Sequence, residues 1–114
     1  MALSEAEIWH NPSCSKSRAV LRLIEECGLA PTIRHYLTDP PDTVELRAML
    51  AALALPAAAL LRPEGKSLKD RSESEIIAAM ATDPKLIERP VVRLGSRAVI
   101  ARPPDKVAQL LDTG

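Results

Sequence analysis

The chain of 114 residues is long enough for one domain with a continuous hydrophobic core, and residues 1–114 are interpreted as that single domain. Its 15 basic and 15 acidic side chains cancel, and apart from histidine its only aromatic residues are Trp9 and Tyr36. This composition argues against nucleic-acid binding and against an anionic membrane surface as partner, because there is no excess of positive charge and few rings on which bases could stack. No apolar run approaches a membrane span and the N-terminus lacks a signal-peptide pattern, so we expect a soluble, cytoplasmic protein.

The N-terminal part of the chain predicts a strand followed by a helix. Residues 7–10 form a short strand signal, and an amphipathic pattern runs from about Ser15 to Cys27. Gly28 is placed to end that helix.

Cys14 lies between these two elements, in the loop His10-Asn11-Pro12-Ser13-Cys14-Ser15-Lys16-Ser17-Arg18. At a strand-to-helix junction, unpaired backbone N–H groups and the positive end of the helix dipole favour the thiolate, and Lys16 and Arg18 add positive charge. Most free cysteines are inert and buried, but the thiolate is the nucleophilic form. The polar and basic neighbours therefore predict that Cys14 is reactive.

Cys27 is interpreted differently, because it falls on the apolar stripe of the same predicted helix. Thirteen helical residues would place it about 20 Å from Cys14 at a rise of 1.5 Å per residue. We expect Cys27 to be a core thiol and not a disulfide partner of Cys14. Two cysteines in unlike surroundings do not indicate a disulfide framework.

The middle of the chain predicts a second strand and a group of helices. The segment 32–37 is rich in alternating and β-branched residues, and 38–41 is a turn. Capping-box spacings begin two helices. The expected elements are a helix from Asp42 and Glu45 to about Leu53, a short helix over 55–61 with Pro56 at its first position, a loop over 62–71, and a helix from Ser72 and Glu75 to about Thr82.

The C-terminal part predicts a hairpin and a last helix. After a turn at 83–85, with a short helix at Leu86 and Ile87 as one interpretation, strands are expected at 91–94 and 97–101. Gly95-Ser96 suits a type II′ turn between them. A helix follows from about 103–105, with Val107 and Leu110 on its apolar side.

The order β-α-β-α-α-β-β-α indicates an α/β, thioredoxin-like fold. It has a mixed four-stranded sheet and an inserted helical segment between strands two and three. In that arrangement the catalytic thiol follows the first strand, where Cys14 lies. By the same analogy, Arg89-Pro90 is expected to be a cis peptide bond next to the thiol, although only about 5–6% of X–Pro bonds in folded proteins are cis.

Arginines stand at three element boundaries. Arg62 follows the segment 55–61, Arg89 precedes the third strand, and Arg102 ends the fourth. A guanidinium group donates two parallel hydrogen bonds and keeps its charge, which suits a tetrahedral oxyanion. The alternative for any single arginine is a solvated or salt-bridged surface role, which we expect for Arg22, Arg47 and Arg97. Sequence alone does not place the three boundary arginines near Cys14.

The segments 8–18, 61–62, 86–92 and 102–104, together with the turn 36–41, resemble the glutaredoxin-coupled arsenate reductase family. The resemblance spans nearly the whole chain. It implies that Cys14 is the nucleophile and that Arg62, Arg89 and Arg102 hold the oxyanion. It further implies that His10 and Ser17 lower the pKa of the thiol or orient its loop, and we expect Asn11 to contribute to substrate binding.

The resemblance implies a mechanism in which Cys14 attacks arsenate and displaces hydroxide. Glutathione, as co-substrate, then attacks the arsenic adduct, and glutaredoxin reduces the glutathione intermediate as arsenite is released. No bound cofactor and no metal are expected. Because residues 14–17 read C-x-x-S, no second cysteine can close a local disulfide, which favours an external reductant.

Two alternatives stay open from the sequence. One is a family member that acts on another oxyanion or on another thiol substrate. The other is a redox regulator like the Spx proteins, which share this fold and bind RNA polymerase. Those proteins typically switch through a C-x-x-C pair, and Ser17 stands where the second cysteine would be.

Overall fold

The computed structural model describes residues 6–112, and within them four strands form one mixed sheet in the order β2-β1-β3-β4. Strand β1 pairs in parallel with β2, and β3 runs antiparallel to both β1 and β4. The strands are β1 Ala6–Trp9, β2 Thr32–Arg34, β3 Val91–Leu94 and β4 Arg97–Ile100. The sheet confirms the predicted α/β, thioredoxin-like fold class.

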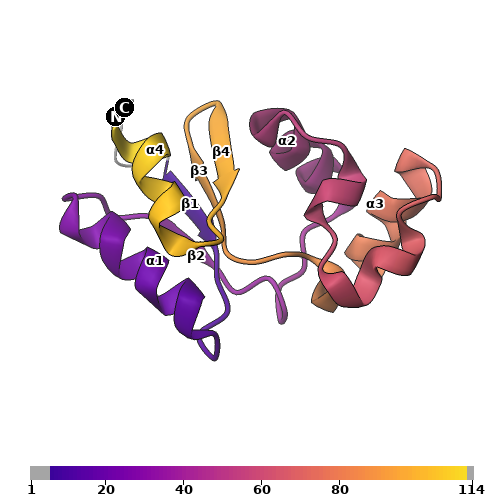
Figure 1. The fold of residues 1–114 in the computed structure, drawn as a ribbon, viewed down its shortest axis with the longest axis horizontal. Coiled ribbons are helices and arrows are strands. Elements are labelled where there is room, and N and C mark those ends of the chain that lie inside the picture. Colours follow the sequence, from indigo (N-terminus) through magenta and orange to yellow (C-terminus); the bar gives the residue numbers. More distant parts are fainter. Residues whose placement is uncertain (1–5, 113–114) are drawn as a thin grey trace.

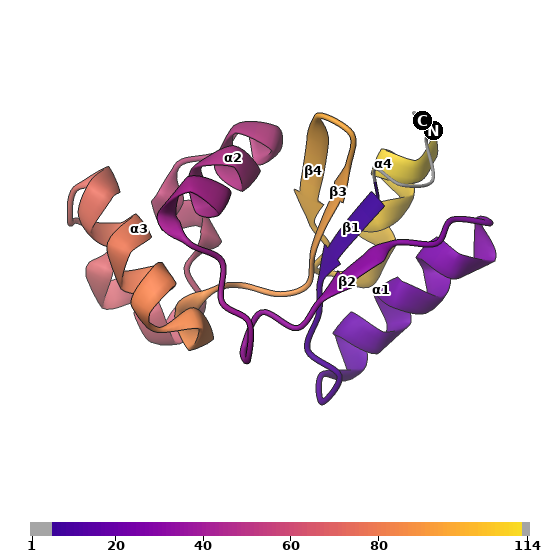
Figure 2. The ribbon, with the colours of Figure 1, turned by 180° about the vertical axis from the view of Figure 1, so that it is seen from behind.

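Helices cover both faces of the sheet (Figure 1, and from behind in Figure 2). Helices α1 (Ser15–Glu26) and α4 (Val107–Asp112) pack on one face, and α2 (Thr43–Leu53) lies on the other with α3 (Glu73–Thr82) beside it. Short 3₁₀ helices join these elements: η2 Ala57–Leu60, η3 Pro63–Leu68, η4 Pro84–Leu86 and η5 Pro104–Lys106. Within residues 6–112, no helix combines the length and apolar character needed to cross a membrane.

The alternation of side chains along the strands produces two hydrophobic clusters. Ile8 of β1 and Val92 of β3 point toward α1 and α4. Their neighbours Trp9 and Val91 point the other way, into the cluster formed with α2 and α3. The loop that follows β1 is therefore anchored at Trp9, a residue with 2% exposure.

Helix α1 ends where Gly28 was predicted to end it, in the left-handed region at a φ of 84°. The N–H of Gly28 donates to the Glu25 carbonyl and that of Leu29 donates to the Ile24 carbonyl, the hydrogen-bond pattern of a Schellman motif. Leu29 packs against the cluster that contains Ile24. Cys27 is exposed, so its prediction as a core thiol was wrong. The helix ends before Cys27, and after the turn at Gly28 it is the partly buried Leu29 that packs against this cluster.

Both predicted capping boxes are confirmed. The side chains of Asp42 and Ser72 accept the N–H groups of Glu45 and Glu75, whose carboxylates accept in return. The hairpin is also confirmed, with Gly95 at a φ of 63° between β3 and β4.

Several boundaries differ from the predictions. Strand β1 covers 6–9 where 7–10 was expected, β4 ends one residue before 101, and η4 covers 84–86 where a turn at 83–85 and a short helix at 86–87 were expected. Strand β2 ends at Arg34, before 35–37, because Thr38 and Asp39 both donate backbone hydrogen bonds to the His35 carbonyl and close a turn. Pro56 precedes η2 and does not occupy its first position. The segment 62–71 contains η3 where a loop was expected, and it begins with Pro63 and a hydrogen bond from the Gly65 N–H to the Arg62 carbonyl at 2.8 Å.

The peptide bond Arg89-Pro90 is cis, as the fold analogy predicted. A second cis bond, Arg102-Pro103, was not predicted.

Ala54 provides a test of the backbone at the end of α2. It adopts the left-handed conformation, with a φ of 57°, and closes this helix with the same hydrogen-bond pattern as Gly28. An L-residue with a β-carbon is disfavoured there by roughly 1–2 kcal/mol, part of which glycine's greater unfolded-state freedom offsets. Ala54→Gly should therefore raise the free energy of unfolding by about 0.5–1 kcal/mol, measured by urea denaturation.

Ala48→Gly is the matched control, since Ala48 is an exposed alanine inside α2. It should lower the free energy of unfolding by about 1 kcal/mol. A loss of stability of the same size in Ala54→Gly would contradict the strain at position 54.

Candidate active site

The sheet topology brings four chain segments to one edge. Because β1 and β2 are parallel, the residues after Trp9 and after Arg34 leave the sheet together. Val91 at the start of β3 pairs with Trp9, and it pairs with Ile100 at the end of β4. The loop with Cys14, the turn with Tyr36, the segment 88–90 and the segment 101–102 therefore meet at this edge.

The Cys14 loop is a tight turn that leads into α1. The N–H of Cys14 donates to the Asn11 carbonyl at 2.9 Å, and its carbonyl accepts the first helical hydrogen bond, from Arg18, at 3.0 Å. Cys14 has the extended conformation of a residue that precedes a helix. The Asn11 side-chain oxygen accepts the Ser13 N–H at 3.0 Å, and Arg18 donates to the Pro12 carbonyl at 2.7 Å. These bonds hold the sulfur beside the first turn of α1.

His10 and Ser17 lie beneath this loop and are both buried. The Ser17 hydroxyl lies 2.7 Å from His10 Nδ1 and accepts the Asn11 N–H at 3.1 Å. Burial lowers the pKa of His10, and the nearby His35 and Arg18 lower it further, so the ring is neutral at neutral pH. A neutral ring can accept the Ser17 hydroxyl proton at Nδ1. The chain His10–Ser17–Asn11 thus orients the loop that carries Cys14.

Cys14 is half-buried, and its environment favours the thiolate. Burial alone would raise the pKa of Cys14, but the backbone N–H groups of Ser17 and Lys16 and the charges of Arg89 and Arg102 lower it below its ordinary value. The predicted effect of the helix terminus is therefore present.

Glu88 links two of the three boundary arginines. Its Oε1 lies 3.5 Å from Arg89 Nη1 and 3.8 Å from Arg102 Nη1. Arg102 also donates to the Arg89 carbonyl at 3.2 Å. The Nε of Arg89 is buried without a hydrogen-bond partner among the described residues, so this guanidinium has donor capacity for an anion. The structure brings Arg89 and Arg102 together next to Cys14.

Arg62 reaches the same region by a different route. Leu61 forms a β-bridge with Ile87, and the N–H of Arg62 donates to the Leu86 carbonyl at 2.8 Å. This pairing fixes Arg62 beside the segment that leads to Arg89. The charges of Arg62 and Arg89 both act on the buried hydroxyl of Tyr36.

The sequence did not identify Tyr36 and Glu88 as site residues. Burial raises the pKa of Tyr36 despite the two arginines, and the Cys14 and Glu88 charges raise it further, so Tyr36 presents a neutral hydroxyl. The signal for Tyr36 was the parallel pairing of the first two strands, because residues that follow parallel neighbours meet at one edge. Glu88 adjoins Arg89 in sequence, but its contact with Arg102 depends on the β3–β4 pairing.

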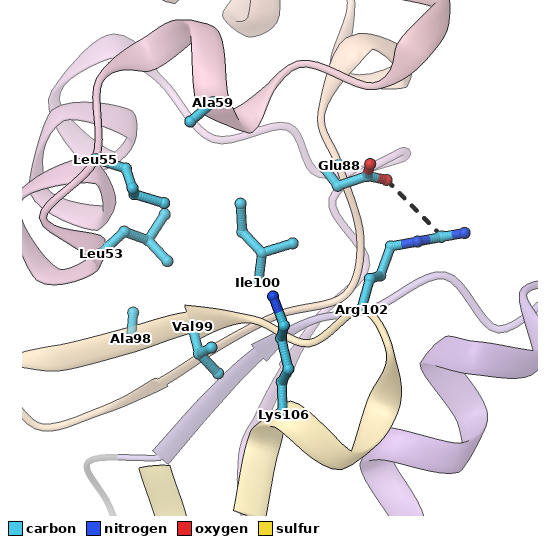
Figure 3. Close-up of a pocket in the computed structure, with 9 residues that line it drawn as sticks. All are labelled: Leu53, Leu55, Ala59, Glu88, Ala98, Val99, Ile100, Arg102 and Lys106. Carbon is cyan, nitrogen blue, oxygen red and sulfur yellow. Dashed lines mark ion pairs between the residues drawn. The ribbon is translucent and has the colours of Figure 1, made fainter. Parts of the chain in front are cut away.

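A cavity of about 320 Å³ adjoins the arginine pair (Figure 3). Leu53 and Leu55 lie at one end, and Glu88 with Arg102 at the other. Lys106 extends along the wall between them, beside Ile100. Ala59, Ala98 and Val99 complete the lining.

Comparison with known proteins gives a consistent result. Residues 9–110 match the model of the ArsC family. The chain is 37% identical to the uncharacterized protein YfgD of Escherichia coli (strain K12), over 94% of this chain and 97% of that one. It is 35% identical to an arsenate reductase of Neisseria meningitidis serogroup A, over 96% and 100% of the two chains. The solved structure of an arsenate reductase from Vibrio cholerae superimposes with a TM-score of 0.87 at 38% identity, covering 96% of this chain and 98% of that one.

The electrostatic account of Cys14 predicts an altered thiol titration. In a Cys27→Ser background, which removes the exposed second thiol, the Cys14 thiolate absorbance should titrate below the ordinary value for cysteine. Arg89→Gln should raise the pKa of Cys14, because it removes a nearby positive charge.

Arg22→Gln is the control, since Arg22 is exposed on α1, away from the first turn. It should leave the titration of Cys14 unchanged. Equal shifts in the Arg89 and Arg22 variants would mean that Arg89 has no specific effect on the thiol.

Proposed function

We propose that this chain, which belongs to the ArsC family, is an arsenate reductase whose nucleophile is Cys14. The relatives named arsenate reductase support the activity, since they align with almost the whole chain at 35% and 38% identity. The observation that carries the assignment of the nucleophile is the lowered pKa of Cys14 beside Arg89 and Arg102. A thiolate next to paired guanidinium groups is suited to attack a bound tetrahedral oxyanion.

In the first step, the Cys14 thiolate attacks the arsenic atom of arsenate, and a sulfur–arsenic bond replaces an arsenic–oxygen bond. The oxygen leaves as hydroxide or, after protonation, as water. Arg62, Arg89 and Arg102 hold the other oxygens and stabilise their negative charge. The neutral Tyr36 hydroxyl can donate a hydrogen bond at the same place.

External thiols supply the electrons in this proposal. Glutathione attacks the arsenic adduct on Cys14, and glutaredoxin reduces the resulting glutathione intermediate as arsenite leaves. In total, one arsenate and two thiols give arsenite, one disulfide and water, so arsenic gains the two electrons that the thiols lose. We place this reaction in the cytoplasm, where a glutathione pool keeps thiols reduced.

The position of the second cysteine supports an external reductant. Cys27 lies at the opposite end of α1 from Cys14, with the 12-residue helix between them. At 1.5 Å per residue this separates the two residues by roughly 18–20 Å, beyond the reach of a disulfide. Ser17 occupies the position of the second cysteine in a C-x-x-C motif, and its hydroxyl is hydrogen-bonded to His10.

A reductase assay tests the proposed function. Cys14→Ser should lower arsenate-dependent NADPH oxidation, coupled through glutathione, glutaredoxin and glutathione reductase, by more than about 1,000-fold, because it removes the nucleophile. Cys27→Ser should keep wild-type turnover, because Cys27 is exposed and remote.

Three other outcomes would redirect the proposal. Turnover that survives in Cys14→Ser would rule out Cys14 as the nucleophile. An inactive wild type whose Cys14 still titrates low would indicate another oxyanion or thiol substrate. Capture of RNA polymerase by the inactive wild type would favour the regulator alternative.

The arginine pair makes a separate prediction. Arg89→Lys should lower kcat/KM for arsenate by about 10- to 100-fold, although charge is preserved, because lysine lacks the planar pair of donors. Arg97→Lys is the conservative control on the exposed part of β4. Unchanged kcat/KM in Arg89→Lys would contradict a bidentate role for Arg89.

A further inference from the structure

The cavity beside the arginine pair has a mixed lining, of which the proposed reaction uses only Arg102. Its apolar wall comes from the end of α2, from η2 and from β4, and its charged residues are Glu88, Arg102 and Lys106 (Figure 3). Its volume of about 320 Å³ lies at the lower end of the range for ligand pockets, about 300–1,000 Å³. It is therefore large enough for a compact organic molecule and larger than a tetrahedral oxyanion requires.

Arg102 belongs both to this cavity and to the Cys14 site. It lines the cavity, contacts Glu88 and the Arg89 carbonyl, and lies close enough to Cys14 for its charge to act on the thiol. A molecule seated in the cavity would therefore have one end beside the arginines that are expected to hold the arsenic oxyanion. This is where the second reactant must approach.

We propose that this cavity binds the small thiol co-substrate, a tripeptide of the glutathione type, with its sulfur directed past Arg102 toward Cys14. The proposal rests on the proposed reductase function and identifies the binding site of its electron donor. Glutathione carries two carboxylates and one ammonium group. Of the charged residues in the lining, Arg102 and Glu88 pair with each other, and Lys106 is placed to receive one of the ligand's carboxylates.

The Lys106 ammonium group favours a ligand that carries a carboxylate. It is an exposed residue of η5, and Figure 3 shows its side chain extending along the cavity wall toward Ile100. Among the residues that the structure describes, no ion pair engages its ammonium group. A ligand carboxylate in the cavity would form an ion pair with this ammonium group. A wholly apolar ligand would desolvate the Lys106 ammonium group without compensation, which disfavours it.

The test uses S-methylglutathione, which has the charges of glutathione but cannot react as a thiol. Its binding to the wild-type chain is measured by isothermal titration calorimetry. Lys106→Gln should raise the dissociation constant about five- to tenfold, because it removes one charge-assisted hydrogen bond. Ala59→Leu should also weaken binding, because the larger side chain occupies part of the cavity.

Lys69→Gln is the matched control, since Lys69 is an exposed lysine outside the cavity lining. Weaker binding in Lys106→Gln and Ala59→Leu, with Lys69→Gln unchanged, is the expected result. Failure of the wild type to bind at millimolar ligand, or equal affinity in all variants, would overturn the proposal.

The binding measurement does not depend on turnover, so it separates the two proposals. If the wild type is active and Lys106→Gln keeps the same half-saturating glutathione concentration, the reductase function stands and the proposed glutathione site is wrong. An inactive wild type that binds S-methylglutathione through Lys106 would reject arsenate as substrate and retain the thiol site.

Discussion

The convergence of positive charge beside one thiol is the constraint on which the candidate site depends. Two like unit charges about 4 Å apart repel by about 4 kcal/mol at the effective dielectric of a protein surface, so clustered guanidinium groups need negative charge nearby. Glu88 supplies it between Arg89 and Arg102, and the Cys14 thiolate supplies more. The same charges that favour the thiolate are those that would receive an oxyanion. Substrate affinity and thiol reactivity are thus coupled, because both depend on the same arginine charges. Glu88 neutralises part of this positive charge, and a bound anion would neutralise more of it.

The fold holds this group with strand pairing and a buried side-chain hydrogen bond, neither of which depends on substrate. The β-bridge between Leu61 and Ile87 fixes Arg62, the pairing of Val91 with Ile100 sets Arg89 beside Arg102, and the buried His10–Ser17 contact fixes the Cys14 loop. Donors that are already in place need not reorganise when charge develops on the substrate, which is the condition for electrostatic stabilisation of a transition state. On this view the mixed sheet contributes to the chemistry by bringing four segments to one edge.

What could be predicted from sequence follows from the range of each interaction. The Cys14 loop, the capping boxes of Asp42 and Ser72 and the turn at Gly95 are local, and each was identified from neighbouring residues. The contact between Glu88 and Arg102 joins residues 14 positions apart through strand pairing, and no local pattern encodes it. Local reasoning failed at Cys27, where periodicity indicated burial but the Schellman motif ended the helix and the partly buried Leu29 packs against the core instead. It also missed η3, in which Gly65 lies close to Leu86, 21 positions further along the chain.

A crystal structure of the chain soaked in arsenate, with anomalous data collected at the arsenic edge, tests the central claim most directly. The account predicts an arsenic peak at bonding distance from the Cys14 sulfur, with its oxygens contacted by Arg62, Arg89 and Arg102. An arsenic atom bound elsewhere, or one bound to Cys14 with its oxygens turned away from all three arginines, would contradict it.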